Sequence, residues 1–353
     1  MLQRWRSWTR ARTPWLLRAL MLALSLVACS RKGGTEQADA PQAPSGSAIP
    51  EPDPLGDPSV PKEIKAFYFG HSLLAGQKAS PDYHVPYNIG IFAAAKGHRY
   101  ETHGQLGWGT PLVEHWKWRS DKLADGPLGF ASENKPPFYA GRNGKAELSE
   151  GGYNVVVFTD VNGNARGGEQ DPVVDALLGF IQLARAKDPK ARAYLYSVWN
   201  ELPVEDQADR TAVKKWRDAT LSELRWWENV ADTVNTKAPS ARLRLVPVSA
   251  VFAELVWDAI NGKVPGAGAP LEAKALFIDE VHGSSIAYYA AAAALYAAIF
   301  KESPLGATAE QVHGAFAGAK VDYTLPSAET ARYIQQRAYE IVRGFPRAGL
   351  SPG

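Results

Sequence analysis

Short apolar runs alternate with longer amphipathic stretches from residue 62 to the end of the chain. The short runs are rich in β-branched and aromatic residues and predict strands near 64–69, 98–104, 153–159, 192–198 and 242–248. The longer stretches have helical spacing and predict helices near 85–96, 172–187, 208–235, 249–261, 284–300 and 327–343. This alternation is typical of an α/β protein whose parallel sheet is covered by helices on both faces. We therefore predict one such domain over residues 62–353.

One stretch, between residues 117 and 150, breaks the alternation because it is polar, rich in Gly and Pro and without a period. It is long for a connection inside a compact domain. We interpret it as an insertion near the sheet edge where α/β folds bind their ligands, with a partial lid as one role. Neither this stretch nor the helical segment after Lys301 has a pattern strong enough to predict a second domain.

The N-terminal segment has the features of an export signal. It carries five arginines, followed by an apolar stretch from Ala19 that ends in the sequence LVAC at Cys29. The stretch is too short to span a bilayer, so it predicts a signal peptide over residues 1–28. LVAC resembles a bacterial lipobox, which implies that Cys29 is lipidated and anchors the chain to a membrane. Cys29 is the single cysteine, and a plain secretory signal with an unpaired cysteine is the alternative. Ser30 in place of Asp favours the outer membrane of a Gram-negative envelope.

The segment after the signal differs in composition from the rest of the chain. Residues 29–61 are rich in Pro, Gly, Ser, Ala and Gln and have no apolar period, so we predict a disordered tether. Removal of the signal leaves 34 basic and 37 acidic residues, a formal net charge of −3. This charge balance gives no reason to expect a nucleic-acid partner.

The first chemical signal follows the first predicted strand. An apolar aromatic run, Ile64 to Phe69, stops at Gly70, and Ser72 comes two residues later. A buried strand that ends in Gly delivers the next residues to the carboxyl edge of the sheet. A serine at that edge is placed to act as a nucleophile, provided that a base removes its proton. Serine is also a favoured helix N-cap, and this stretch alone leaves both interpretations open.

The second chemical signal, Asp279 and His282, lies in one short loop before an Ala/Tyr-rich helical run. At this spacing the carboxylate can hold one imidazole nitrogen while the other nitrogen faces a serine hydroxyl. An Asp-x-x-His sequence alone is common by chance. Its pairing with Gly-x-Ser-Leu more than two hundred residues upstream, at the other end of the α/β pattern, favours the nucleophilic interpretation of Ser72.

Two sequence blocks together resemble those of the SGNH (GDSL-like) hydrolase superfamily. They are GHSL at residues 70–73 and DEVH at residues 279–282, and the resemblance covers residues 62 to 300 as an ordered set of blocks. His71 replaces the usual Asp, but that side chain is not the nucleophile in the family. The resemblance implies a three-layer, flavodoxin-like α/β/α fold. It also implies a Ser72–His282–Asp279 triad that works without a cofactor.

The resemblance further implies an oxyanion hole with three donors. The first is the backbone N–H of Ser72. The second is a Gly after the second strand, for which Gly109 is the first choice and Gly107 the second. The third is an Asn after the third strand, where this chain reads DVNGN and lacks the family's usual Gly. Asn162 is at the matching offset, with Asn164 as the fallback. The Gly and Asn-Gly sequences are also ordinary turn signals.

A metal site is the main alternative chemistry, because His84, His98, His103 and His115 lie close together in the sequence. Their spacing matches no zinc pattern, and there is no His-Glu-x-x-His run. Glu101 and His103 would share one face of a strand, which is the best argument for a metal. We predict no metal site and interpret these histidines as surface or supporting residues.

Tryptophans suggest a second kind of contact, because flat aromatic faces suit sugar rings. Trp108 lies between the candidate oxyanion glycines, and Trp199 follows the fourth strand, so both are candidate substrate contacts. Four others fit helical packing patterns and are assigned to the core: Trp216, Trp226, Trp227 and Trp257. Trp116 and Trp118 fit either role.

These observations converge on a membrane-tethered serine esterase of the bacterial cell envelope. The expected substrates are small-molecule or glycan esters with short acyl groups, and acetate on a carbohydrate is the most specific form of this hypothesis. One alternative keeps the fold and transfers the acyl group to a sugar hydroxyl. Another is a non-catalytic surface binding lipoprotein with a relict site.

Overall fold

The computed structural model describes residues 62–75, 84–117, 128–133, 138–141, 143–162, 168–307 and 326–350. The signal peptide, Cys29 and the tether lie outside these ranges, as do Trp118 and Asn164. In the part of the chain that is described, no helix is both long and apolar enough to cross a membrane.

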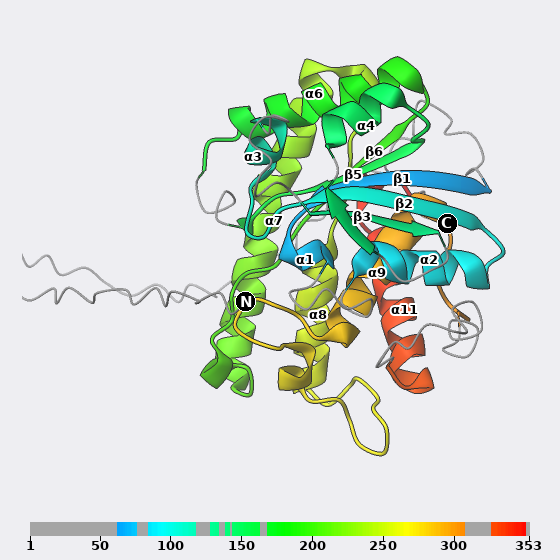
Figure 1. Cartoon of the computed structure of the whole chain (residues 1–353). Coiled ribbons are helices and arrows are strands. Elements are labelled where there is room, and N and C mark those ends of the chain that lie inside the picture. Colours follow the sequence, from blue (N-terminus) through cyan, green and yellow to red (C-terminus); the bar gives the residue numbers. More distant parts are fainter. Residues whose placement is uncertain are drawn as a thin grey trace, which may run out of the picture. The chain divides into compact units, whose positions relative to one another are not determined.

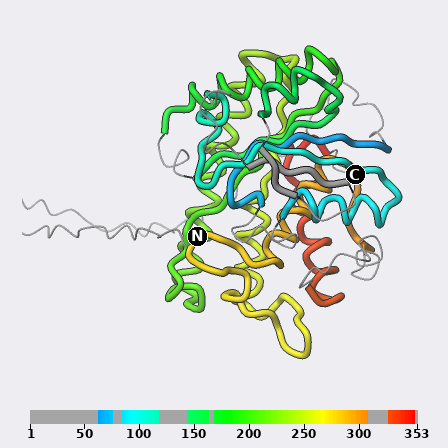
Figure 2. Tube along the Cα trace, in the orientation of Figure 1, coloured from blue at the N-terminus to red at the C-terminus, as the bar shows by residue number. Residues whose placement is uncertain are grey.

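A seven-stranded sheet with the order β4-β3-β2-β1-β5-β6-β7 forms the centre of the fold. Five of its strands are parallel: β1 (Glu63–Gly70), β2 (Arg99–Leu106), β5 (Val155–Thr159), β6 (Arg192–Tyr196) and β7 (Arg244–Val246). The blue trace of β1 runs between cyan β2 and green β5 (Figure 2). The apolar runs of the sequence are these five strands, so the predicted parallel sheet is confirmed.

The polar stretch between residues 117 and 150 partly belongs to the sheet. Its strands β3 (Leu128–Glu133) and β4 (Phe138–Gly141) pair antiparallel and extend the sheet beyond β2. Helix α4 (Gly144–Glu150) then returns the chain to β5. The sequence did not predict these strands, because LGFASE and FYAG contain no β-branched residue and are rich in small residues. The described part of this stretch is therefore an edge of the sheet and not a lid.

Helices cover both faces of the sheet, as the alternation predicted (Figure 1). On one side lie α4 and α6 (Asp171–Lys187). On the other lie α2 (Val85–Ala95), α9 (Ser285–Phe300) and α11 (Ala328–Arg343). The long helix α7 (Arg210–Lys237) contacts both α6 and α8 (Val248–Ile260). The result is a flavodoxin-like three-layer α/β/α arrangement.

The two faces of β1 show why the sheet needs helices on both sides. Phe69 packs on Phe180 of α6, with ring centroids 4.0 Å apart. Tyr68, the neighbouring residue, faces the opposite way and its hydroxyl bonds to that of Tyr100. All three side chains of the run from Phe67 to Phe69 are fully buried. Burying each such aromatic side chain contributes about 1.5–3 kcal/mol, so the central strand holds the two helical layers together.

Candidate active site

The turn after β1 positions Ser72 through a close approach that only glycine allows. A Cβ atom added to Gly70 would lie 2.7 Å from Cδ2 of Leu74 and 2.9 Å from Cγ2 of Thr159. The short helix α1 (Ser72–Ala75) starts directly after this contact. Ser72 is thus the first residue of α1 and not its cap. The backbone N–H of Leu73 donates instead to Nδ1 of His71, at 3.3 Å.

The loop that carries Asp279 and His282 is closed by backbone hydrogen bonds. Phe277 and Gly283 form an isolated antiparallel bridge. The N–H of Ile278 donates to the carbonyl of His282 at 2.9 Å, and the N–H of Ser284 donates to that of Leu276 at 2.9 Å. Helix α9 begins at Ser285, so the loop sits between this bridge and a buried helix. These contacts therefore hold the backbone of Asp279 and His282 in place.

The structure brings Ser72, His282 and Asp279 into one hydrogen-bonded chain. Nε2 of His282 lies 2.9 Å from Oγ of Ser72. Nδ1 of the same ring lies 2.8 Å from Oδ2 of Asp279 and 3.0 Å from its Oδ1. With the proton on Nδ1, which donates to the carboxylate, Nε2 can accept the serine proton. The geometry is that of a nucleophile, a base and an orienting acid in sequence.

Asp279 is held in its charged form by several donors. Burial raises the pKa of this carboxyl. Hydrogen bonds from the backbone N–H groups of His282 and Val281, and from the imidazole of His282, lower it. Their combined effect is larger than that of burial, so the pKa of Asp279 lies below its ordinary value. The two backbone donors reach Oδ1 at 2.6 and 2.9 Å. The carboxylate therefore stays ionised at neutral pH.

Trp199 supports the Asp279–His282 loop from behind, which corrects its assignment as a substrate contact. Its side chain is fully buried and packs on Phe252, with ring centroids 4.4 Å apart. Its indole N–H donates to the carbonyl of Val281 at 2.8 Å. A ring without exposed surface cannot stack on a sugar, so Trp199 is a positioning residue.

The segment after β6 holds the same loop at two further points. The N–H of Leu202 donates to the carbonyl of Glu280 at 2.7 Å. The side-chain amide of Gln207 donates to the carbonyl of Asp279 at 2.9 Å. Together with Trp199, these bonds fix three consecutive carbonyls, those of residues 279, 280 and 281. The chain between β6 and α7 thus sets the position of the imidazole.

Two tyrosines from distant elements hold helix α1. The hydroxyl of Tyr288 donates to the carbonyl of Ser72 at 2.9 Å, and that of Tyr196 donates to the carbonyl of Leu73 at 2.7 Å. Burial raises the pKa of Tyr196, so its hydroxyl keeps its proton and remains a donor. Sequence reasoning missed both tyrosines, because neither lies in a local pattern with Ser72.

His71 stands where the resemblance expects an Asp, and it is a buried neutral ring. Its Nδ1 accepts from Leu73, so its Nε2–H donates to the carbonyl of Asp160 at 3.0 Å. Burial lowers the pKa of His71 to about 4, partly opposed by the bond to Asp160 and assisted by the charge of His282. A neutral ring here adds no second positive charge beside the imidazole of His282.

Asp160 is another residue that the sequence did not single out. Its side chain is fully buried at the end of β5. Its Oδ1 accepts from the backbone N–H of Leu112 at 3.0 Å and of Val161 at 2.8 Å. Leu112 opens helix α3 (Leu112–Lys117), so this carboxylate ties β5 to that helix while its backbone carbonyl holds His71. A polar residue directly after a buried strand was the available signal.

The oxyanion candidates differ in whether their N–H groups already donate a hydrogen bond within the protein. Gly107 is ruled out as a donor because its N–H already donates to the carbonyl of Gly70 at 3.0 Å. Gly109 lies in an exposed turn with φ +61°, a conformation that favours glycine. Its N–H has no hydrogen-bond partner among the described residues. Asn162 donates one amide N–H to the carbonyl of Trp199 at 3.1 Å, and its second N–H is a further donor.

The remaining aromatic candidate and the histidines are distributed over the fold. Trp108 is 44% exposed in the turn after β2. His103 lies 3.5 Å from Glu101, as their shared strand face predicted. Within the described ranges, no group of three or more His, Cys, Asp or Glu side chains could hold a metal ion. His84 and His115 are buried, and burial lowers the pKa of each to about 3.

Comparisons with known proteins identify the fold alone. No family model matches the chain, and no curated protein matches it. A DUF4886 family protein from Bacteroides uniformis ATCC 8492 is similar in structure, with 12% identity and a TM-score of 0.51 over 79% of this chain and 95% of that one. TesA is 16% identical with a TM-score of 0.37, over 66% of this chain and 96% of its own, too distant to support an argument.

Proposed function

We propose that the chain is a serine-type carboxylic ester hydrolase of the SGNH kind, with Ser72 as nucleophile. The observation that carries this proposal is the bond of 2.9 Å between Nε2 of His282 and Oγ of Ser72, while Nδ1 of the same ring faces Asp279 at 2.8 Å. A serine hydroxyl is a poor nucleophile unless an adjacent base takes its proton. Here the base is in contact with the hydroxyl before any substrate arrives.

The reaction has two halves. In the first, His282 accepts the proton of Ser72 while Oγ attacks the ester carbonyl. It then returns that proton to the leaving alcohol. In the second half, His282 takes a proton from the water that attacks the acyl-enzyme and returns it to Oγ of Ser72 as the acid leaves. Asp279 stays ionised throughout and stabilises the imidazolium that forms in each half.

The oxyanion of each tetrahedral intermediate needs donors that are otherwise free. The N–H groups of Leu73 and Leu74 already bond to His71, and that of Ser72 has no partner within the described residues. We assign the N–H of Ser72 as the first donor, that of Gly109 as the second and the amide of Asn162 as the third. Each such donor contributes about 3 kcal/mol of transition-state stabilisation in a characterised protease.

For the substrate we propose short acyl esters, with acetate on a carbohydrate as the specific case. Trp108 supports this proposal, since a large aromatic side chain that is 44% exposed beside Gly109 offers a flat face to a sugar ring. For the location we propose a bacterial envelope lipoprotein, lipidated at Cys29 and tethered by residues 29–61, on the strength of the LVAC sequence and the composition that follows it.

The test is labelling with a fluorophosphonate, followed by mass spectrometry. We expect the adduct on the Ser72 peptide, and no adduct in Ser72→Ala. Ser284→Ala is the matched control, because this serine lies in the chain beside His282 and its Oγ has no partner within the described residues. It should label like the wild type. An adduct on another residue, or no adduct on folded wild-type protein, would overturn the proposal.

A further inference from the structure

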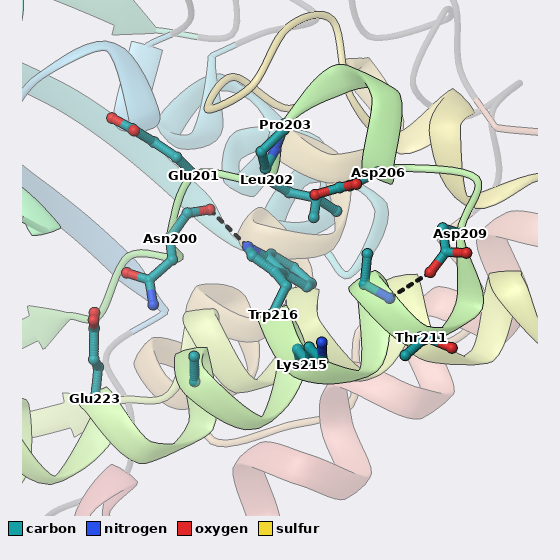
Figure 3. A pocket seen from close by; sticks show the side chains of 12 residues that line it. Asn200, Glu201, Leu202, Pro203, Asp206, Asp209, Thr211, Lys215, Trp216 and Glu223 are labelled. Atoms are coloured by element: carbon teal, nitrogen blue, oxygen red, sulfur yellow. Dashed lines mark hydrogen bonds between the residues drawn. The ribbon is translucent and has the colours of Figure 1, made fainter. Parts of the chain in front are cut away.

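A pocket of about 580 Å³ lies between the chain that follows β6 and the first turns of α7 (Figure 3). Its volume is in the range of small-molecule sites. One wall is the segment from Asn200 to Asp206, and the other is the face of α7 that carries Lys215, Trp216 and Glu223. The indole N–H of Trp216 donates to the backbone carbonyl of Asn200 at 2.9 Å, so the two walls are fixed to each other.

An unused acceptor lies in the wall of this pocket. The side chain of Asn200 is only 5% exposed, yet its Oδ1 accepts no hydrogen bond within the described residues. In Figure 3 this amide turns away from Trp216 and toward Glu223. A buried amide oxygen without a donor is unfavourable, because it has lost its hydrogen bonds to water. A ligand that brings a donor to Asn200 removes that cost after a small rotation of the amide.

The charges around the pocket determine which donor fits. Lys215 is the one cation among the residues that line the pocket. Four carboxylates line it as well: Glu201, Asp206, Asp209 and Glu223. Oδ1 of Asp209 already caps α7 by accepting from the N–H of Ala212 at 2.6 Å. Even without Glu223, the carboxylates of Glu201 and Asp206 outnumber Lys215. Carboxylates only accept hydrogen bonds, so the pocket suits a ligand with many donors and a positive charge.

We propose that this pocket binds a cationic, hydroxyl-bearing ligand, such as an amine-bearing sugar. Its ammonium would pair with Asp206, and its hydroxyls would donate to Asn200. The same wall holds the loop of Asp279, because the N–H of Leu202 donates to the carbonyl of Glu280. A ligand seated here is therefore one hydrogen bond away from the loop of His282. The proposal stands on the pocket and does not depend on the esterase activity.

The experiment is calorimetric titration of the mature protein with glucosamine and, separately, with glucose. The two probes differ only in one ammonium group, so we expect glucosamine to bind about tenfold more tightly, as one charge-assisted hydrogen bond provides. Asp206→Asn should remove most of that preference. Glu205→Gln is the matched control, because Glu205 is an exposed carboxylate of the same loop outside the pocket lining. It should leave both affinities unchanged.

Asn200→Ala tests the orphaned acceptor and should weaken both sugars alike, with an unchanged Tm showing that the variant folds. Equal affinity for glucose and glucosamine, or a preference for glucosamine that survives Asp206→Asn, would overturn the proposal. The two proposals fail separately. If phosphonate labelling fails while glucosamine binds as described, the esterase proposal is wrong and the proposal of a ligand site in the pocket stands.

Discussion

Replacing Asp279 by Asn tests the orienting role of the carboxylate with the smallest possible change in shape. The variant keeps one oxygen, which can still accept from the backbone N–H groups of His282 and Val281 as Oδ1 does at 2.6 and 2.9 Å. The loop should therefore fold. The position 2.8 Å from Nδ1 of His282, now held by Oδ2, would be an amide nitrogen that donates. Nδ1 must then accept, which moves the proton to Nε2 and blocks the uptake of the serine proton.

The size of the effect follows from the charges involved. A carboxylate and an imidazolium whose charges are about 4 Å apart interact by about 4 kcal/mol at an effective dielectric constant of about 20. Since each ~1.4 kcal/mol is a factor of ten in rate, loss of the charge alone lowers kcat about 10³-fold. The wrong tautomer adds to this loss. The corresponding change in a known serine protease costs about 10⁴-fold.

The assay is hydrolysis of p-nitrophenyl acetate by wild type, Asp279→Asn and Glu280→Gln. Glu280→Gln is the matched control, because it removes the same charge from the neighbouring residue, whose side chain is exposed. We expect a loss of 10³- to 10⁴-fold in kcat for Asp279→Asn with little change in KM, and wild-type values for the control. If Asp279→Asn retains activity within tenfold while its Tm is unchanged, the carboxylate does not orient His282 and the reasoning fails.

Three further predictions concern other parts of the chain. Cys29→Ser should move the protein from the membrane fraction to the soluble fraction or stall its processing; unchanged partition on fractionation would point to another anchor. Trp199→Phe removes the bond of 2.8 Å to Val281 and should lower stability by about 1–3 kcal/mol and reduce kcat more than it changes KM. Denaturation and kinetics check this together, and an unaltered kcat would contradict the positioning role. His71 has a folded pKa of about 4 against 6.5 unfolded, so the unfolded chain binds more protons and stability is lost as pH falls from about 6.5 to about 4, by about 3 kcal/mol at most. His71→Asn should show a correspondingly shallower dependence in denaturant titrations, and an equal slope would show that the ring titrates normally.

The pattern of apolar residues was sufficient to predict the elements that are buried along their whole length. The run from Val155 to Thr159 is buried at every position, and such runs have no other stable place than the middle of a sheet. By contrast, β3 and β4 lie at the edge of the sheet and contain no β-branched residue that would mark them as strands. Their pairing beside β2 depends on contacts with a strand far along the chain, which no local window contains.

In the site, the residues that lie in short motifs were predictable and those that act across space were not. Ser72 and the Asp279–His282 loop could be found because each sits in a recognisable block. The burial of Trp199 was not visible in the sequence, since a tryptophan after a strand can face the solvent or the core. The hydrogen bond from Tyr288 to the carbonyl of Ser72 crosses 216 positions. Only the packing of α9 against the sheet brings those two residues together.

The separation of Ser72 and His282 by 210 positions has a consequence for how the protein matures. Contacts between residues so far apart carry a large loop-closure entropy cost, which slows their formation. We expect catalytic competence to appear after secondary structure during refolding, as a lag between recovery of circular dichroism and recovery of hydrolysis. During synthesis the serine emerges long before its base. If the proposed esterase function holds, a nascent chain cannot hydrolyse esters before its C-terminal part has been made.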